Sequence, residues 1–303
     1  MALHIIRSTD PLPMTTLVVT IYGQPGIGKT SLAFTAERPL MLDFDHGAHR
    51  SAFRKDSVRV DSWVDVANLT PEDLAGYKTI VLDTAGRALD AITAHIGRTQ
   101  PKLTSSSGNL TLQGYGELKA VFLAWLKRVR QLGMDVVILA HDTEDKSGDD
   151  LIVRPDIQGG SKSELYKASD AIGYMYRPQR GQTLLDFNPS DRWIGKNCAD
   201  LDPVPVPDFR QSPTFFADVI QSMKDRVNQL TDEQRAAVEA IEAAREIYGA
   251  MTTAEDINTA VTSLSADVSN PILPQLKKLL AHRATELGLE WDKENRQYRR
   301  VAS

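Results

Sequence analysis

Short apolar runs alternate with amphipathic stretches over the first two-thirds of the chain. The apolar runs occupy residues 16–22, 40–44, 79–82, 135–140, 171–176 and 183–187. Several of them are apolar throughout, which is typical of strands buried on both faces of a mostly parallel sheet. The stretches with helical spacing between them are 31–37, 87–96 and 114–132. This alternation predicts an α/β fold in which a mostly parallel central sheet is flanked by helices.

The pattern changes after residue 200, where helical spacing replaces the alternation. Residues 203–207 read Pro-Val-Pro-Val-Pro, a candidate for a stiff, extended linker. Beyond it, a capping box at 231–234 predicts one helix start, Thr253 opens a second helix, and a third follows Asn270 and Pro271. We expect four parts: an N-terminal extension at 1–15, a core at 16–202, a linker at 203–208 and a small all-helical C-terminal domain at 209–303.

The sequence Gly-Gln-Pro-Gly-Ile-Gly-Lys-Thr directly follows the first apolar run. It matches the phosphate-binding pattern G-x-x-x-x-G-K-T, and its strand–loop–helix context disfavours the alternative of a glycine-rich turn with a surface lysine. Glycines let successive backbone N–H groups curve around a phosphate. Lys29 is expected to reach the β- and γ-phosphates, and the Thr30 hydroxyl to ligate Mg²⁺. The residues expected to bind the nucleotide are Gly23, Gln24, Pro25, Gly26, Ile27, Gly28, Lys29, Thr30 and Ser31.

The apolar run at 79–82 is followed by an acid, Asp83. An aspartate at such a strand end lies beside the phosphate-binding loop, so we expect it to hold Mg²⁺ through water rather than simply to cap the next turn. Residues 83–86 also read D-x-x-G, which in a GTPase contacts the γ-phosphate, but no N-K-x-D guanine element follows. The expected ligands are therefore ATP and Mg²⁺, and the expected activity is ATP hydrolysis.

Two further strand ends carry polar residues toward the expected nucleotide. Asp43 and Asp45 close the second run, and a carboxylate near the γ-phosphate can orient the attacking water. We favour Asp45 for this role, with an exposed loop acid as the alternative. His141 ends the run at 135–140 and is a candidate sensor of the γ-phosphate, the alternative being a plain polar strand terminus.

Composition limits the partners and the compartment. The formal net charge of −5 argues against binding nucleic acid with the whole surface, but it leaves room for a local basic groove. The stretch 231–260 is acidic and the tail from Leu273 is basic, which favours solvated helix faces over a nucleic-acid tail.

The one cysteine, Cys198, excludes an internal disulfide and fits a reducing cytoplasm. Neither a signal peptide nor an apolar run of roughly 20 residues is evident, so we expect no membrane partner.

Together these motifs resemble the RecA-like recombinase ATPases, especially the phage-encoded core-only proteins associated with recombination and single-strand annealing. The resemblance spans roughly residues 16–200. Asp45 stands where a family strand ending in I-D-A-E-H has its catalytic glutamate, and His141 stands where the family has a glutamine sensor. Residues 196–198 are similar to a K-N-K element whose lysines reach the ATP of a neighbouring subunit, with Cys198 in place of the second lysine. Lys196 is the candidate for that contact, the alternative being an exposed strand lysine.

The resemblance also implies two DNA-binding loops. They correspond to residues 98–109 and 142–158, and a Gly-Gly element that leads into a helix follows the second. The second loop is acidic, so the better phosphate candidates are Arg98, Lys102, Lys162, Lys167 and the basic tail.

The implied function is an ATP-dependent, single-stranded-DNA-binding protein of recombination or annealing, in which hydrolysis switches an interface or a DNA loop. Its implied partners are single-stranded DNA, further copies of itself in a ring or filament, and a single-strand-binding or annealing protein, in a bacterial host cytoplasm if the chain is phage-encoded. The alternative is a nucleotide-switched, partner-binding ATPase of the helicase-loading type. The acidic stretch at 231–260 and the negative net charge support that alternative.

Overall fold

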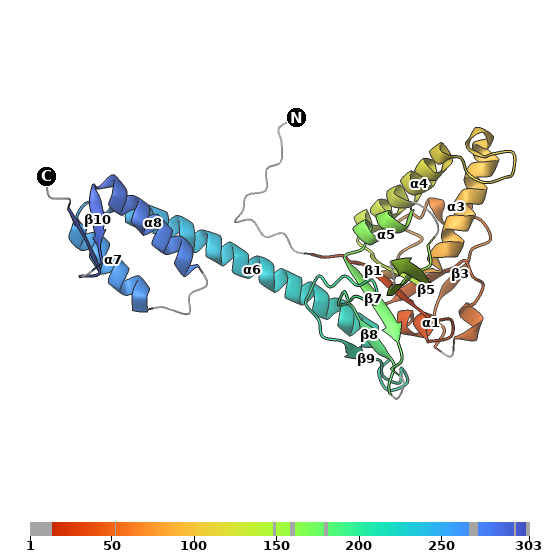
Figure 1. Cartoon of the computed structure of the whole chain (residues 1–303). Helices are drawn as coiled ribbons and strands as arrows, with labels where there is room; N and C mark the ends of the chain where they lie inside the picture. Colours follow the sequence, from red (N-terminus) through yellow and green to blue (C-terminus); the bar gives the residue numbers. More distant parts are fainter. Residues whose placement is uncertain are drawn as a thin grey trace. The chain divides into compact units, whose positions relative to one another are not determined.

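The computed structural model describes residues 14–51, 53–147, 150–157, 161–178, 181–266, 272–293 and 295–300. The described chain divides into two units, one spanning Met14–Val227 and one beginning at Asn228. We call them the core unit and the C-terminal unit. Figure 1 shows their helices and strands coloured along the sequence.

Nine strands among the described residues form the sheet of the core unit, in the order β3-β2-β4-β5-β1-β7-β8-β9, with β6 paired to β5. The pairings among β1 to β5 and with β7 are parallel, whereas β6, β8 and β9 pair antiparallel. The bounds are β1 Val18–Gly23, β2 Pro39–Asp43, β3 Ser57–Arg59, β4 Thr79–Asp83, β5 Asp135–Ser147, β6 Asp150–Pro155, β7 Ala171–Tyr176, β8 Leu184–Asp186 and β9 Val204–Pro205. The predicted α/β class with a mostly parallel sheet is confirmed.

Helices cover both faces of this sheet, which is why its central strands are apolar throughout. Along β1, Val18 and Tyr22 pack into the cluster that includes α3 and α4, whereas Val19 and Ile21 pack into the cluster with α1 and the start of α6. Figure 1 shows α3, α4 and α5 together on one side of the sheet. The helices are α1 Lys29–Ala33, α2 Val64–Ala67, α3 Ala85–Thr99, α4 Leu112–Gln131 and α5 Ser161–Ala168, with 3₁₀ turns at Ala48–Arg50 and Pro101–Leu103.

The two predicted DNA loops are more regular than expected. β5 runs on past the sheet to Ser147 and pairs antiparallel with β6, so most of 142–158 is a β-hairpin rather than a loop. Its charged residues do not form the apolar run from which the other strands were predicted, because a hairpin beyond the sheet needs no apolar faces. In the first segment, α3 continues to Thr99 and a bridge joins Thr104 to Leu110. The Gly-Gly element at 159–160 lies outside the described residues.

The expected linker at 203–208 is wrong. Val204–Pro205 forms β9 on the sheet edge, where proline is tolerated because one side of an edge strand needs no hydrogen-bond donor. Val206 and Phe209 are buried in the core. The division between the units falls inside α6, Phe215–Ala250, instead. Residues 1–13 of the expected N-terminal extension lie outside the described part of the chain.

The C-terminal unit is mainly helical, with α7 Ala254–Ala266 and α8 Leu273–Glu286, but it is not all-helical. A hairpin of β10 Leu289–Asp292 and β11 Gln297–Arg300 follows α8. The capping box at 231–234 starts no helix, because α6 runs through it, whereas the predicted start at Thr253 is confirmed: its Oγ1 accepts from the Asp256 N–H at 3.1 Å. Asn270 and Pro271 lie outside the described residues. No helix in the described ranges has the length and apolar character that a membrane span requires.

Candidate nucleotide-binding site

The phosphate-binding loop joins the carboxyl end of β1 to the first turn of α1. Gly26 and Gly28 have φ angles of 78° and 108°, in the left-handed region that residues with a Cβ disfavour. At Gly23, a Cβ would collide with the carbonyl oxygen of Met175 on the neighbouring β7. The glycines are therefore required by the path of the loop as well as by access for a phosphate.

Lys29 lies folded over this loop. Its Nζ donates to the carbonyl oxygens of Gly23 and Gln24, at 2.6 and 2.9 Å. Burial of the side chain lowers the pKa of Lys29 to about 8, while the carboxylates of Asp142 and Asp83 act in the opposite direction. An ammonium group that has lost most of its water is stabilised strongly by an anion, so the position suits contact with a phosphate.

Asp83 closes β4 and meets the loop directly. Thr30 Oγ1 donates to Asp83 Oδ2 at 2.8 Å. Burial raises the pKa of Asp83 to about 6, the charges of Asp43 and Asp45 add to the rise, and the Thr30 hydrogen bond and Lys29 oppose it. A hydroxyl and a carboxylate oxygen are hard ligands of the kind that Mg²⁺ prefers, and a cation there would keep Asp83 ionised. The pair therefore fits a magnesium ion.

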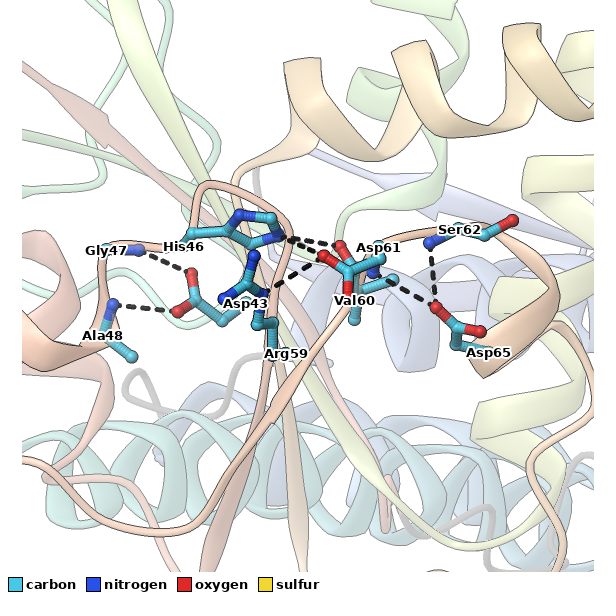
Figure 2. A network of polar contacts seen from close by, with 9 residues as sticks. All are labelled: Asp43, His46, Gly47, Ala48, Arg59, Val60, Asp61, Ser62 and Asp65. Carbon is cyan, nitrogen blue, oxygen red and sulfur yellow. Dashed lines mark hydrogen bonds and ion pairs between the residues drawn. The ribbon is translucent and has the colours of Figure 1, made fainter.

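Asp43, the last residue of β2, binds the loop that follows (Figure 2). Its two carboxylate oxygens accept the backbone N–H groups of Gly47 and Ala48, both at 2.9 Å. His46 turns this loop with a φ of 53°, and its Nε2 lies 3.2 Å from the carbonyl oxygen of Val60. With a backbone N–H bound to each of its oxygens, Asp43 stabilises the loop that follows β2.

Asp45 instead lines the cavity in front of the phosphate-binding loop. Its side chain is 32% exposed, and its oxygens lie 3.4 Å from Arg50 Nη2 and 3.7 Å from Arg87 Nε. The same loop that buries Asp43 thus presents Asp45 to the cavity. Of the two acids, Asp45 is therefore the one that lines the cavity.

His141 lies beside Gly23 in the parallel register of β5 and β1, and it lines the same cavity. Its Nδ1 is buried and has no hydrogen-bond partner among the described residues. Burial, and then the charge of Lys29, lower the pKa of His141, so the ring is neutral at pH 7. A neutral imidazole whose buried Nδ1 is unsatisfied retains capacity for one more hydrogen bond.

These side chains surround a cavity of about 260 Å³. The predicted residues that line it are Pro25, Gly26, Gly28, Lys29, Thr30, Ser31, Asp45, Asp83 and His141. Gly23 and Gln24 contribute through the carbonyls that hold Lys29, and Ile27 packs against the hydrophobic core.

Lys196 is not brought to this cavity. Its Nζ donates to the carbonyl oxygen of Ser169 at 2.5 Å, just before β7. The next residue, Asp170, accepts the N–H of Val18 at the start of β1. Lys196 therefore lies at the amino ends of the strands, whereas the phosphate-binding loop lies at their carboxyl ends.

Sequence reasoning missed several residues of the cavity wall. Arg50 and Ser51 come from the 3₁₀ turn after β2 and the residue that follows it, and Ser51 Oγ lies 3.0 Å from Ser31 Oγ. Thr84 follows Asp83 directly. Thr84 could have been predicted from its place directly after Asp83. Nothing in the local sequence indicates that the turn at 48–50 folds back to the phosphate-binding loop.

A phosphate-binding loop follows the central strand β1, a buried acid lies on β4, and a cavity lies at the carboxyl ends of the strands. This arrangement is that of a P-loop nucleotide-binding domain. A family model described as an AAA domain matches residues 15–199, more than half of the chain. The chain belongs to this family, which implies nucleotide binding, typically with Mg²⁺.

One similar curated protein is the SPbeta prophage-derived uncharacterized protein YorG of Bacillus subtilis, 24% identical over 168 residues. The match covers 51% of each chain, so this chain spans about half the length of that relative. Among solved structures, the KaiC-like protein PH0186 of Pyrococcus horikoshii is similar with a TM-score of 0.32 and 10% identity. That likeness covers 56% of this chain and 76% of the other.

Proposed function

We propose that the chain is an ATP-dependent, single-stranded-DNA-binding protein that acts in recombination or single-strand annealing of a phage. One observation carries the proposal. A second chamber of about 440 Å³ shares Asp45 and His141 with the nucleotide cavity. Its walls also include Asn109 from the first predicted DNA segment and Asp156 from the second. Both segments thus border the place where the γ-phosphate would lie.

The β5–β6 hairpin supplies the coupling in this proposal. β5 continues without interruption from His141 into the hairpin, and the N–H of Asp156 donates to the His141 carbonyl at 2.8 Å on the return. A shift of His141 toward or away from a γ-phosphate would therefore move a hydrogen-bonded pair of strands rather than a slack loop. This is how the nucleotide state would be transmitted beyond the cavity.

The site residues take the following roles in the proposal. Lys29 contacts the β- and γ-phosphates, Thr30 and Asp83 hold Mg²⁺, which neutralises developing charge, and Asp45 orients the attacking water. His141, which lines the cavity, senses the γ-phosphate. Lys196 lies at the opposite ends of the strands from its own nucleotide, so its role in the proposal is a contact with the nucleotide of a neighbouring copy in a ring or filament.

A second candidate function is supported by the charge of the hairpin. Asp142, Glu144 and Asp145 lie on β5, and Arg154 on β6 is bound to Asp145. An acidic hairpin repels phosphates and would suit a basic protein surface. The alternative is therefore a nucleotide-switched ATPase that recruits a replication or annealing protein.

ATP turnover with and without single-stranded DNA separates these functions. We expect DNA to stimulate phosphate release by the native chain, and Lys29→Ala to lower turnover by about 100-fold or more, because a charge contact to the transferred phosphoryl group is lost. Lys127→Ala, an exposed lysine on α4, is the matched control and should retain turnover. Circular dichroism should show that Lys29→Ala stays folded. Turnover indifferent to DNA would favour the partner-binding ATPase.

A further inference from the structure

We propose that the C-terminal unit binds single-stranded DNA in the groove between α7 and β11, which rests on the proposed function and gives the DNA a location. The groove has a volume of about 550 Å³. Its polar walls are formed by Asn258, Thr259, Thr262, Gln297, Tyr298, Arg299 and Arg300, with one acid, Glu255. Amide, hydroxyl and guanidinium groups are those that contact the phosphates and sugars of nucleic acids.

The two walls of the groove are joined by a reciprocal pair of hydrogen bonds. Asn258 Nδ2 on α7 donates to the Tyr298 carbonyl at 2.9 Å, and the Tyr298 N–H donates to Asn258 Oδ1 at 2.6 Å. This pair fixes β11 beside α7 at the centre of the hairpin. A preformed groove loses little conformational freedom when a ligand enters it.

An aromatic pair adjoins the groove. Trp291 on β10 lies opposite Tyr298, with ring centroids 5.0 Å apart and the planes at 65°. The Trp291 residue is 42% exposed, whereas Trp63 and Trp125 of the core unit are 2% and 4% exposed. An exposed indole held by a second ring is a platform on which an unpaired base can stack, and duplex bases are not available for this.

Charge complements this platform. Residues 273–300 hold seven Lys and Arg against four Asp and Glu, in a chain whose net charge is −5. The Arg299 side chain is 70% exposed, with its Nη1 3.5 Å from Asp292 Oδ2, and Arg300 is also exposed. The acidic β5–β6 hairpin repels phosphates, so this basic and aromatic surface is the better place for a DNA strand.

The test is the binding of fluorescent oligothymidylate to the full chain, followed by anisotropy over a series of salt concentrations. The double variant Arg299→Ala and Arg300→Ala should flatten the slope of log affinity against log salt by about 1.4, the value for two lost phosphate contacts on a single strand. Trp291→Ala should weaken binding roughly 5- to 100-fold, and Trp291→Phe should restore most of it. Arg235→Ala and Arg245→Ala together, both on α6, are the charge-matched control and should leave the slope unchanged.

The outcomes separate this inference from the proposed function. Unchanged binding by the Arg299 and Arg300 double variant would overturn the groove and leave the function standing. Absence of binding by the native chain at low salt would overturn both. Equal affinity for duplex DNA or polyglutamate would show a general anion surface and overturn the single-strand assignment. Groove-dependent binding that is identical with ATP, with ADP and in Lys29→Ala would support the groove and contradict the nucleotide switch.

Discussion

The nucleotide site of the core unit and the helices of the C-terminal unit hold charged residues in different surroundings. In the core unit, Lys29 and Asp83 are buried and their pKa values are displaced toward neutrality. In the C-terminal unit, Arg245 and Glu242 pair at 2.8 Å with side chains 60% and 59% exposed. Buried charges depend on a few fixed partners, whereas exposed ones are screened by salt and replaced by water. The core unit should therefore respond sharply to pH and to single substitutions, and the C-terminal unit to ionic strength.

The largest effect is expected from the charge that faces the nucleotide cavity. Asp45→Asn should lower ATP turnover by about 10²- to 10⁴-fold, because the amide cannot accept a proton from the attacking water. The affinity for a fluorescent ATP analogue should stay within a few-fold of the native value. Phosphate release and equilibrium binding measure the two quantities.

Asp43→Asn is the matched control, two residues away. It replaces one acceptor of the backbone N–H pair at Gly47 and Ala48, so it should cost about 1–3 kcal/mol of stability, measured by urea denaturation. A greater loss of turnover per folded molecule in Asp43→Asn than in Asp45→Asn would reverse the assignment of the two acids.

The next prediction compares the stability that two ion pairs of α6 contribute, one with β5 and one within the helix. Lys224 on α6 donates to Asp135 at 2.7 Å, with side chains only 12% and 7% exposed. Lys224→Ala should destabilise the core unit by about 3–5 kcal/mol, because it leaves a buried carboxylate without its cation. Arg245→Ala, further along α6, should cost about 0–1 kcal/mol. Hydrogen exchange of the β1 and β5 amides measures the first effect, and exchange at α7 and α8 measures the second.

Equal losses of stability in Lys224→Ala and Arg245→Ala would show that burial of the ion pair does not distinguish the units. A loss of protection in α8 with Lys224→Ala as large as that in β5 would show instead that the two units unfold together.

The last prediction is the pH dependence due to Asp83, whose pKa rises from 3.8 to about 6 on folding. Between about pH 4 and pH 6 the folded chain holds a proton that the unfolded chain has released. The unfolding free energy therefore rises as the pH falls through this window, by at most about 3 kcal/mol for the whole shift. The difference in stability between the native chain and Asp83→Asn, measured without nucleotide from pH 7 to pH 4, should follow this rise. A flat difference would show that Asp83 keeps an ordinary pKa.

The sequence by itself determined the class of the core and the centre of its site. Apolar runs such as 79–82 and 171–176 became β4 and β7 almost residue for residue, because strands buried on both faces need apolar side chains throughout. Gly26, Gly28, Lys29 and Thr30 were predictable because a phosphate loop requires particular backbone angles and groups within one short segment. Asp83 followed from its place at the end of a strand.

Only the tertiary structure decided the features that depend on distant partners. Asp43 and Asp45 are alike in sequence, and the fold of the loop separated them by engaging both oxygens of Asp43. The proline-rich segment became a sheet edge, and α6 passed through a valid capping box, because packing outweighed local preference. Arg50 reached the cavity through a loop without periodicity. Neighbouring residues in the sequence determine the local backbone geometry. Burial and contacts between distant residues determine which charged groups face the site.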